Sequence, residues 1–185
     1  MKELNSLGNQ LLIAMPQLQD SWFESAVIYL CEHDQDGAMG LVLNKPLDVD
    51  FAAVCEQLAI TRHQDINAVM LGGGPVGTEQ GFILHQQPGH WNATETISAF
   101  AHLTSSKDIL TAIGQGAGPD NYRLALGYSG WGPGQLDEEI LGNSWLTVEA
   151  DAELLFDTPP ETLYQAALNR LGVSGSALSA QIGHA

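Results

Sequence analysis

Short apolar runs separated by polar turns dominate much of the chain. Residues 25–32 and 37–43 are rich in branched and aromatic side chains, which favours strands, and Asp36-Gly37 between them is typical of a tight hairpin. Proline cannot donate a hydrogen bond within a sheet, so Pro46 is expected to end the second strand. The same pattern predicts strands over residues 10–15, 68–71, 81–85, 95–103, 122–128 and 145–150, with a short extended piece over 153–156.

Four other segments place apolar residues at helical spacing. The first follows Asp50, whose side chain is a suitable N-cap, and runs through Leu58. The others begin near Thr104, Pro133 and Pro159, and Gly172 is expected to close the last. Because helices and hairpins are interspersed without regular βαβ alternation, we expect an α+β fold: one domain over residues 1–185, with a mixed or antiparallel sheet, curled toward a barrel, and flanking helices.

The segment from Gly127 to Trp131 combines glycines with aromatic residues and predicts a sharp turn out of a strand. Two interpretations stay open for its aromatic side chains. Exposed, Tyr128 and Trp131 would be anchors for a partner or a ligand; buried, they would fill the core beneath the turn. Our site hypothesis is a surface pocket near Tyr128, Trp131 and Gln135.

Two further features extend this hypothesis. The Gly72–Gly77 loop follows a strand, and the backbone at Gly73 and Gly74 could cradle phosphate. The loop lacks the lysine and the spacing of known phosphate loops, which favours a tight structural turn. His85 ends an apolar strand, so a hydrogen-bonded core or rim histidine is favoured over a catalytic one, although a cleft shared with the glycine segments stays an alternative.

Three other groups suggest chemistry and favour a structural role. Ser105, Ser106 and Lys107 could form a nucleophile pair, but their place at a helix start indicates capping. Ser129 does not have the spacing of a nucleophile elbow. Glu32, His33, Asp34 and Asp36 offer metal-ligand types, but they occupy a hairpin turn expected to be solvated. We therefore predict no catalytic set, no metal and no cofactor.

The charge of the chain narrows the choice of partners. It contains 22 acidic and 6 basic residues, a formal net charge of −16, and its bases are scattered singly. Nucleic-acid affinity depends on clustered lysine and arginine, so direct binding to DNA or to an anionic membrane is disfavoured and a basic partner protein is favoured. The absence of a long apolar run, and two cysteines, Cys31 and Cys55, expected to be buried and reduced, indicate a cytoplasmic protein.

The chain resembles the AlgH/YqgE family of bacterial proteins. The resemblance rests on an ordered set of segments: residues 12–16, 31–33 with 37–41, 44–46, 73–76, 81–85, 104–110, 127–140 with Trp145, and the closing Gly183-His184-Ala185. It implies a compact mixed α/β protein of the bacterial cytosol. The family is often labelled as transcriptional regulators, its biochemical role is poorly defined, and no catalytic residue can be carried over. Ser129 stands where alanine is commoner.

These observations favour a regulatory protein that acts by binding another protein and catalyses no reaction. One alternative is a small-ligand-binding protein or enzyme that uses a cleft near Gly72–Gly77 and Gly127–Gln135. Another is transcriptional regulation by direct DNA contact, which the family label suggests and the charge opposes. The identity of the partner and the oligomeric state stay open.

Overall fold

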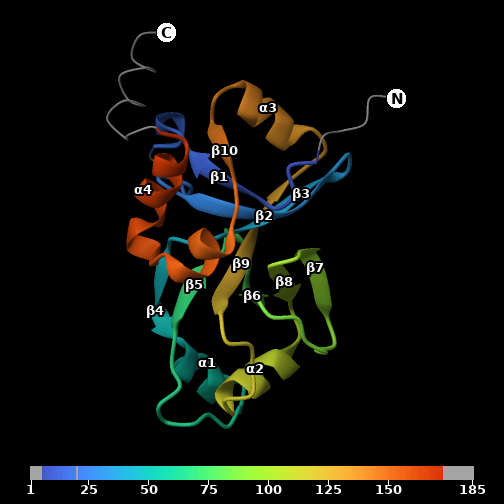
Figure 1. The fold of residues 1–185 in the computed structure, drawn as a ribbon, viewed down its shortest axis with the longest axis vertical. Helices are drawn as coiled ribbons and strands as arrows, with labels where there is room; N and C mark the ends of the chain where they lie inside the picture. Colours follow the sequence, from blue (N-terminus) through green and yellow to red (C-terminus); the bar gives the residue numbers. More distant parts are fainter. Residues whose placement is uncertain (1–5, 20, 173–185) are drawn as a thin grey trace.

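The structure is a computed structural model that describes residues 6–19 and 21–172. The closing Gly183-His184-Ala185 of the family resemblance lies outside these residues. A curled, largely antiparallel sheet in the order β10-β1-β2-β3-β9-β6-β8-β7 forms the framework, and β5 joins β9 while β4 joins β5 (Figure 1). The predicted α+β class, with a mixed sheet curled toward a barrel and flanking helices, is confirmed.

The described residues form ten strands. They are β1 (Gln10–Ala14), β2 (Val27–Asp34), β3 (Gly37–Val42), β4 (Pro46–Asp50), β5 (Val69–Gly72), β6 (Val76–His85), β7 (Thr94–Ser98), β8 (Ala101–Thr104), β9 (Tyr122–Trp131) and β10 (Trp145–Glu149). The helices are a 3-10 turn (Pro16–Leu18), α1 (Phe51–Gln57), α2 (Lys107–Gly114), α3 (Gln135–Leu141), a π-helical turn (Glu153–Asp157) and α4 (Pro160–Arg170).

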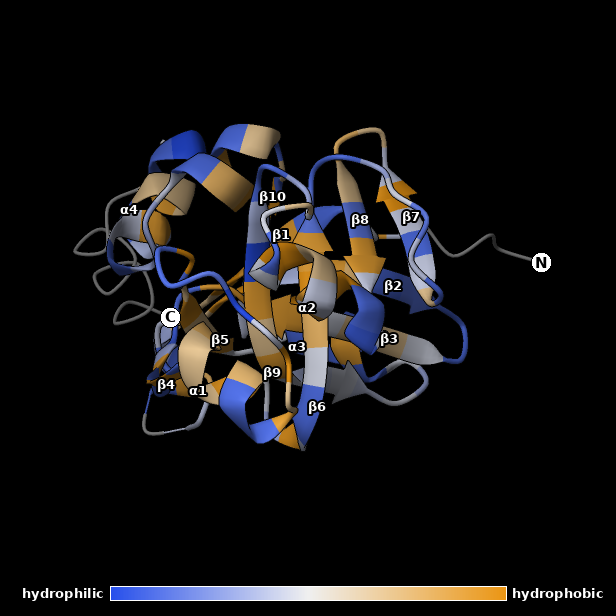
Figure 2. Cartoon of the chain, turned by 90° about the horizontal axis from the view of Figure 1, so that it is seen from below, coloured by the Kyte–Doolittle hydropathy of each residue, from blue (hydrophilic) through white to orange (hydrophobic). Residues whose placement is uncertain are grey.

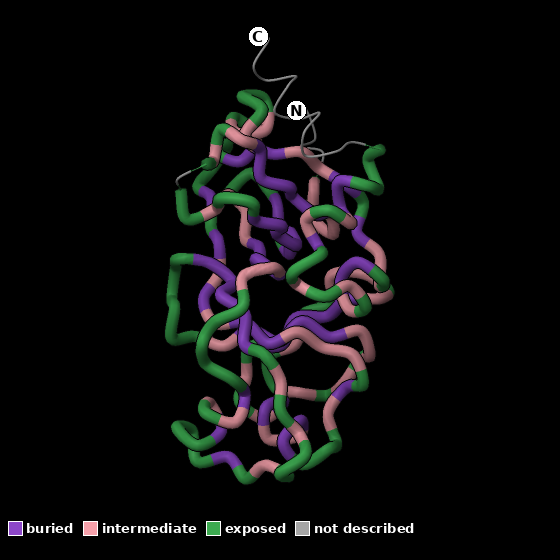
Figure 3. The backbone as a smooth tube through the Cα atoms, turned by 90° about the vertical axis from the view of Figure 1, so that its left-hand side faces the viewer, coloured by how far each residue is buried: buried purple, intermediate pink, exposed green. Residues whose placement is uncertain are grey.

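Strand β9 holds the two parts of the sheet together. Its last residues, Ser129–Trp131, pair antiparallel with β3, while residues 122–126 lie between β6 and β5. The pairing with β5 is parallel. Figure 3 shows buried positions concentrated in the interior of the molecule and exposed positions on its outer loops. Strand β9 therefore contributes residues to both parts of the sheet.

Helices cover different parts of this sheet. Helix α4 packs its buried Leu163, Ala167 and Leu168 into the largest apolar cluster, α3 lies over a second cluster that contains Trp131 and Trp145, and α1 and α2 cover a third. Asp50 caps α1 as predicted, because its carboxylate accepts the Ala53 N–H at 2.9 Å. Gly172, in the left-handed region at φ 69°, closes α4.

Several local predictions were wrong. Residues 95–103 form the hairpin β7–β8 instead of one strand, since Ser98 and Ala101 pair across a turn that contains neither glycine nor proline. Residues 153–157 form a helical turn, which Asp151 caps by accepting the Leu154 N–H. The second strand of the first hairpin, β3, does end before Pro46, at Val42, but the sequence did not predict that Pro46 starts β4, an edge strand where a missing donor is tolerated.

The glycine-aromatic segment also folds differently from the prediction. Strand β9 continues through Gly127 to Trp131, and the turn follows at residues 132–134. Gly127 has φ 79°, opposite an irregular stretch of β6 between Val76 and Gly81. The glycine therefore lies opposite a bulge in β6, in a backbone conformation where a side chain would be strained.

Candidate functional site

Trp131 and Gln135 lie in a closed network that holds α3 on the sheet. The carboxylate of Glu139 accepts the indole N–H of Trp131 at 3.1 Å and of Trp145 at 3.0 Å, and the amide of Gln135 at 2.9 Å. Trp131 is 7% exposed, and its ring meets that of Trp145 edge-on at 6.0 Å. We call Glu139, Trp131, Trp145 and Gln135 the α3 clamp. Of the two interpretations left open for Trp131, the buried one therefore holds: it is a core residue whose indole N–H is already engaged.

His33 also lies against helix α3. It is buried, contrary to the expected solvated turn, although Glu32, Asp34 and Asp36 beside it are exposed. Its Nδ1 accepts the Leu7 N–H at 2.9 Å, so Nε2 carries the proton; this buried atom lies 3.3 Å from an Asp137 carboxylate oxygen of α3 but makes no hydrogen bond. His33 is buried while Glu32 and Asp34 are exposed, because alternate positions of a strand face opposite sides.

His85 lies inside the protein, away from solvent. Its Nδ1 donates to the Gln87 carbonyl oxygen at 2.7 Å, which leaves Nε2 to accept the Thr104 hydroxyl at 2.7 Å. Thr104 in turn shares a hydrogen bond of 2.8 Å with Thr94. Burial lowers the pKa of His85. The fully buried ring, with both nitrogens engaged, agrees with the favoured interpretation of a hydrogen-bonded core histidine.

Gly73 and Gly74 are packed against the backbone of β9. A Cβ at Gly73 would lie 2.4 Å from the Gly127 oxygen, and one at Gly74 would lie 2.0 Å from the Tyr128 backbone. The loop between β5 and β6 is therefore a close crossing of two backbones, which only glycine allows. Both glycines support the position of Tyr128.

Tyr128 is the predicted site residue that lines an open cavity. This cavity, ≈ 680 Å³ in volume, lies between the β2–β3 hairpin and the strands β6, β7 and β8. Its polar groups come from strands that are far apart in the sequence, and the Tyr128 and Phe82 rings meet edge-on at 5.7 Å in its wall. We call it the acidic cleft; its lining consists of Glu32, Met39, Gln80, Phe82, Asn92, Ala93, Thr94, Glu95, Leu103, Ser105 and Tyr128.

Two carboxyl groups face each other in the acidic cleft. A hydrogen bond with Glu95 raises the pKa of Glu32, and burial, repulsion by Glu95 and repulsion by Asp34 raise it further. The fold therefore brings two acidic side chains to one surface, where each disfavours the charged form of the other. Within the described residues, no group of three histidine, cysteine or acidic side chains is arranged to hold a metal.

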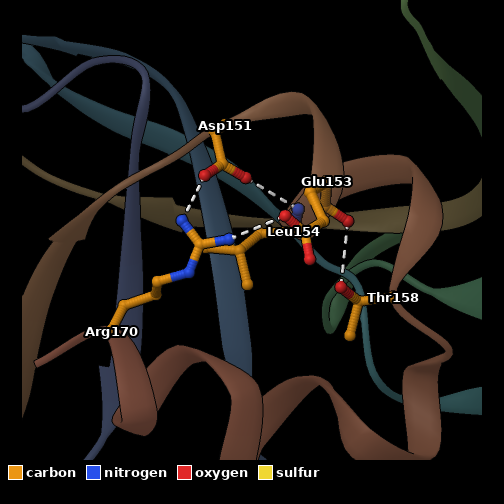
Figure 4. Close-up of polar contacts among 5 residues, drawn as sticks. All are labelled: Asp151, Glu153, Leu154, Thr158 and Arg170. Carbon is orange, nitrogen blue, oxygen red and sulfur yellow. Dashed lines mark hydrogen bonds and ion pairs between the residues drawn. The ribbon is translucent and has the colours of Figure 1, made fainter. Parts of the chain in front are cut away.

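The described basic residues are engaged elsewhere. On α4, Arg170 pairs with Asp151 and, at 3.2 Å, with Glu153, next to the Thr158 hydroxyl that donates to the Glu153 carbonyl oxygen (Figure 4). Three other basic side chains donate to main-chain carbonyl oxygens: Arg62 to Ile66, Lys107 to Leu58, and Arg123 to Leu155 and Thr158. The Lys45 ammonium lies over the ring of Trp22. Consequently none of them neutralises the acidic cleft.

The six residues of the sequence hypothesis do not meet in one pocket. Tyr128 lines the acidic cleft, Gly73 and Gly74 support it from behind, Trp131 and Gln135 lie in the α3 clamp, and His85 is in the core. Glu32 and Glu95 are the acidic residues of the cleft; sequence reasoning considered Glu32 only as part of a solvated hairpin turn and missed Glu95. Glu95 sits in a strand of alternating threonines that gave no signal, and the pairing of β7 that brings it to the cleft is not local.

The curled mixed sheet with flanking helices makes this chain an α+β protein, and the acidic cleft is an open cavity on it. A family model described as AlgH-like matches residues 11–176, so the chain belongs to the AlgH-like family. A UPF0301 protein of Ralstonia pickettii is 46% identical over 98% of this chain and 97% of its own length. One from Vibrio cholerae is 44% identical, over 97% of this chain and 100% of its own length.

Solved structures agree with this assignment. The solution structure of AlgH from Pseudomonas aeruginosa superposes with a TM-score of 0.81 at 42% identity, covering 100% of this chain and 99% of that one. The crystal structure of a Corynebacterium diphtheriae protein, 19% identical, superposes with a TM-score of 0.72 over 97% of this chain and 94% of that one, and supports the fold alone. The comparisons establish the family without assigning a reaction or a ligand.

Proposed function

We propose that this chain acts by binding a basic partner protein in the cytosol and catalyses no reaction. The acidic cleft receives an arginine or lysine side chain of that partner. The observation that carries this proposal is the pair Glu32 and Glu95, two carboxyl groups held together in a cleft that no described basic residue neutralises. A regulatory effect is then exerted through the partner.

The chemistry of the cleft matches a cationic side chain in two ways. A guanidinium or ammonium group between two carboxylates replaces their repulsion with charge-assisted hydrogen bonds. The Tyr128 and Phe82 rings supply aromatic surface for the aliphatic part of such a side chain and for a cation–π contact. The net charge of −16 adds long-range attraction for a basic protein.

A small cationic ligand is the second candidate for the same cleft. The volume of ≈ 680 Å³ falls within the range of about 300–1,000 Å³ that small-molecule sites occupy. Apolar walls at Met39 and Leu103, with polar groups at Gln80 and Asn92, are also typical of such sites. Direct DNA contact gains no support, because the described basic residues are dispersed and engaged within the chain.

The proposal is tested with short peptides that contain one arginine, against otherwise identical peptides with citrulline, and with free arginine amide. We expect the arginine peptides to shift the amide resonances around Glu32, Glu95 and Tyr128. Loss of charge-assisted hydrogen bonds is expected to weaken binding by about tenfold in Glu32→Gln/Glu95→Gln. Glu138→Gln removes a charge from exposed α3 and is the matched control.

The arms of this experiment separate the candidates. Peptide binding much tighter than that of arginine amide supports a protein partner, while equal affinity for both assigns the cleft to a small cation. Equal binding of arginine and citrulline peptides would refute the cationic specificity altogether. None of the described helices has the length and apolar character that crossing a bilayer requires.

A further inference from the structure

A second concave surface lies at the other end of β9 from Trp131. It is a groove of ≈ 530 Å³ between α1, α2 and the strands β4, β5, β6 and β9. Figure 2 shows the apolar colouring of β9 between α1 and β6 at this end of the molecule. We call it the apolar groove, and its buried floor consists of Met70, Ile83, Leu110 and Leu124.

The groove exists because the helices over this face are short. Helix α1 has 7 residues and α2 has 8, whereas β6 and β9 have 10 each. At about 1.5 Å per helical residue and about 3.3 Å per strand residue, helices of roughly 10–12 Å meet strands of roughly 33 Å. A sheet face normally buries its apolar side under a layer of helices. Here that layer leaves part of the face uncovered.

The rim of the groove is apolar and open to solvent. Val49 on β4 is 40% exposed and Leu58, which follows α1, is 38% exposed. Among the side chains that line the groove, Glu79 is the only charged one, and Gln57 and Thr78 add neutral polar groups beside it. Apolar surface with one acidic edge calls for a ligand that is itself apolar on one side and basic on the other.

We infer that the apolar groove binds an amphipathic helix of a partner protein, with its apolar side chains on the floor of the groove and a lysine or arginine at Glu79. The charge of the occupant follows from complementarity with Glu79 and with a chain of net charge −16. Its helical form follows from the missing part of the helical layer, because apolar residues at positions i, i+3, i+4 and i+7 fill such a groove. This inference rests on the proposed binding role but uses a second surface, which shares Phe82 with the acidic cleft and contains neither Glu32 nor Glu95.

The test is a selection from a displayed library of random peptides on the full chain, with counter-selection on Leu58→Asp. Enriched peptides are expected to have apolar residues at helical spacing and a net positive charge. Val49→Asp and Leu58→Asp are expected to weaken these peptides at least tenfold, and Glu79→Gln to reduce the salt dependence of binding. Leu141→Asp, at a residue 84% exposed on α3, is the matched control and should leave binding unchanged.

Unfolding curves of each variant first establish that the fold is intact, which the exposure of Val49 and Leu58 leads us to expect. Enriched peptides without helical spacing, or peptides that bind Leu58→Asp as well as the unmodified chain, would overturn the inference. So would a selection in which no peptide distinguishes the two. A dimer in sedimentation that Val49→Asp dissociates would assign the groove to a second copy instead. Glu32→Gln/Glu95→Gln must leave groove binding intact, so failure of either surface is distinguishable from failure of the other.

Discussion

The α3 clamp and the acidic cleft both contain glutamates, and the two sites use them in opposite ways. In the clamp, one carboxylate, Glu139, accepts three hydrogen bonds from Trp131, Trp145 and Gln135. In the cleft, Glu32 and Glu95 meet each other and no described cation. A satisfied carboxylate stabilises the fold, whereas an unneutralised pair costs stability and leaves binding capacity free. The two glutamate sites therefore differ in what is left for a ligand: the clamp carboxylate is already engaged within the chain, and the cleft pair meets no described cation.

The largest expected effect on stability comes from removing the Glu139 carboxylate from the α3 clamp. Glu139→Ala leaves two buried indole N–H groups without an acceptor, which we expect to lower the free energy of unfolding by about 2–4 kcal/mol. Urea unfolding followed by tryptophan fluorescence measures this change. Glu138→Ala, at the exposed neighbour on the same helix, should stay within about 0.5 kcal/mol. Equal effects of the two variants would show that the clamp does not hold α3.

A smaller effect concerns the buried hydrogen-bond chain behind the cleft wall. Burial lowers the pKa of His85 below its ordinary value of 6.5, and the stacked ring of His102, 5.5 Å away, lowers it further. The folded state therefore resists protonation more than the unfolded state does. The contribution of His85 to stability is complete above pH 6.5 and is lost as the pH falls below that value.

Urea unfolding at several pH values between 5 and 8 tests this prediction. His85→Gln removes the titrating group while retaining polar atoms toward Gln87 and Thr104, and its stability is expected to fall less steeply below pH 6.5. His63→Gln, at an exposed position, is the control and should keep the steep fall of the unmodified chain. If His85→Gln and the unmodified chain lose stability in parallel, another group accounts for the acid response.

The smallest effect has the opposite sign and lies in the cleft. Glu32→Gln relieves the repulsion with Glu95, so the variant is expected to be slightly more stable than the unmodified chain at pH 7, by less than about 1 kcal/mol because the pair is solvent-screened. Because the pKa of Glu32 is raised in the folded state, this advantage appears as the pH rises above 4.5. Thermal unfolding at pH 4 and pH 7 measures it. A destabilised Glu32→Gln would show that the pair is structural.

Local patterns carried most of the fold but little of the site. Asp36-Gly37 identified the β2–β3 hairpin, Asp50 the start of α1 and Gly172 the end of α4, because each reports a short-range constraint on the backbone. Trp131 and Gln135 attracted attention through residue type alone. Their partner Glu139 lies four residues beyond Gln135, so the helical spacing held a signal that a side-chain network was possible.

The acidic cleft illustrates the limit of such patterns. Glu32 and Glu95 meet only because the β2–β3 hairpin faces β7 across the sheet, and nothing near either residue encodes that arrangement. The apolar groove could not be predicted either. Its rim residue Val49 belongs to β4, a strand that the sequence analysis did not predict because Pro46 was expected to end the preceding strand. Both surfaces combine residues that only the order of the strands in the sheet brings together.

The dual pairing of β9 has a consequence for how the chain is made. During synthesis, residues up to β8 emerge before β9, so β3 lacks one neighbour and β5 and β6 cannot yet lie on either side of it. A nascent or truncated chain that stops short of residue 122 carries open strand edges of the kind that promote aggregation. Synthesis of β9 thus joins the two parts of the sheet, and β10 and α4 then add the last strand and the last helix.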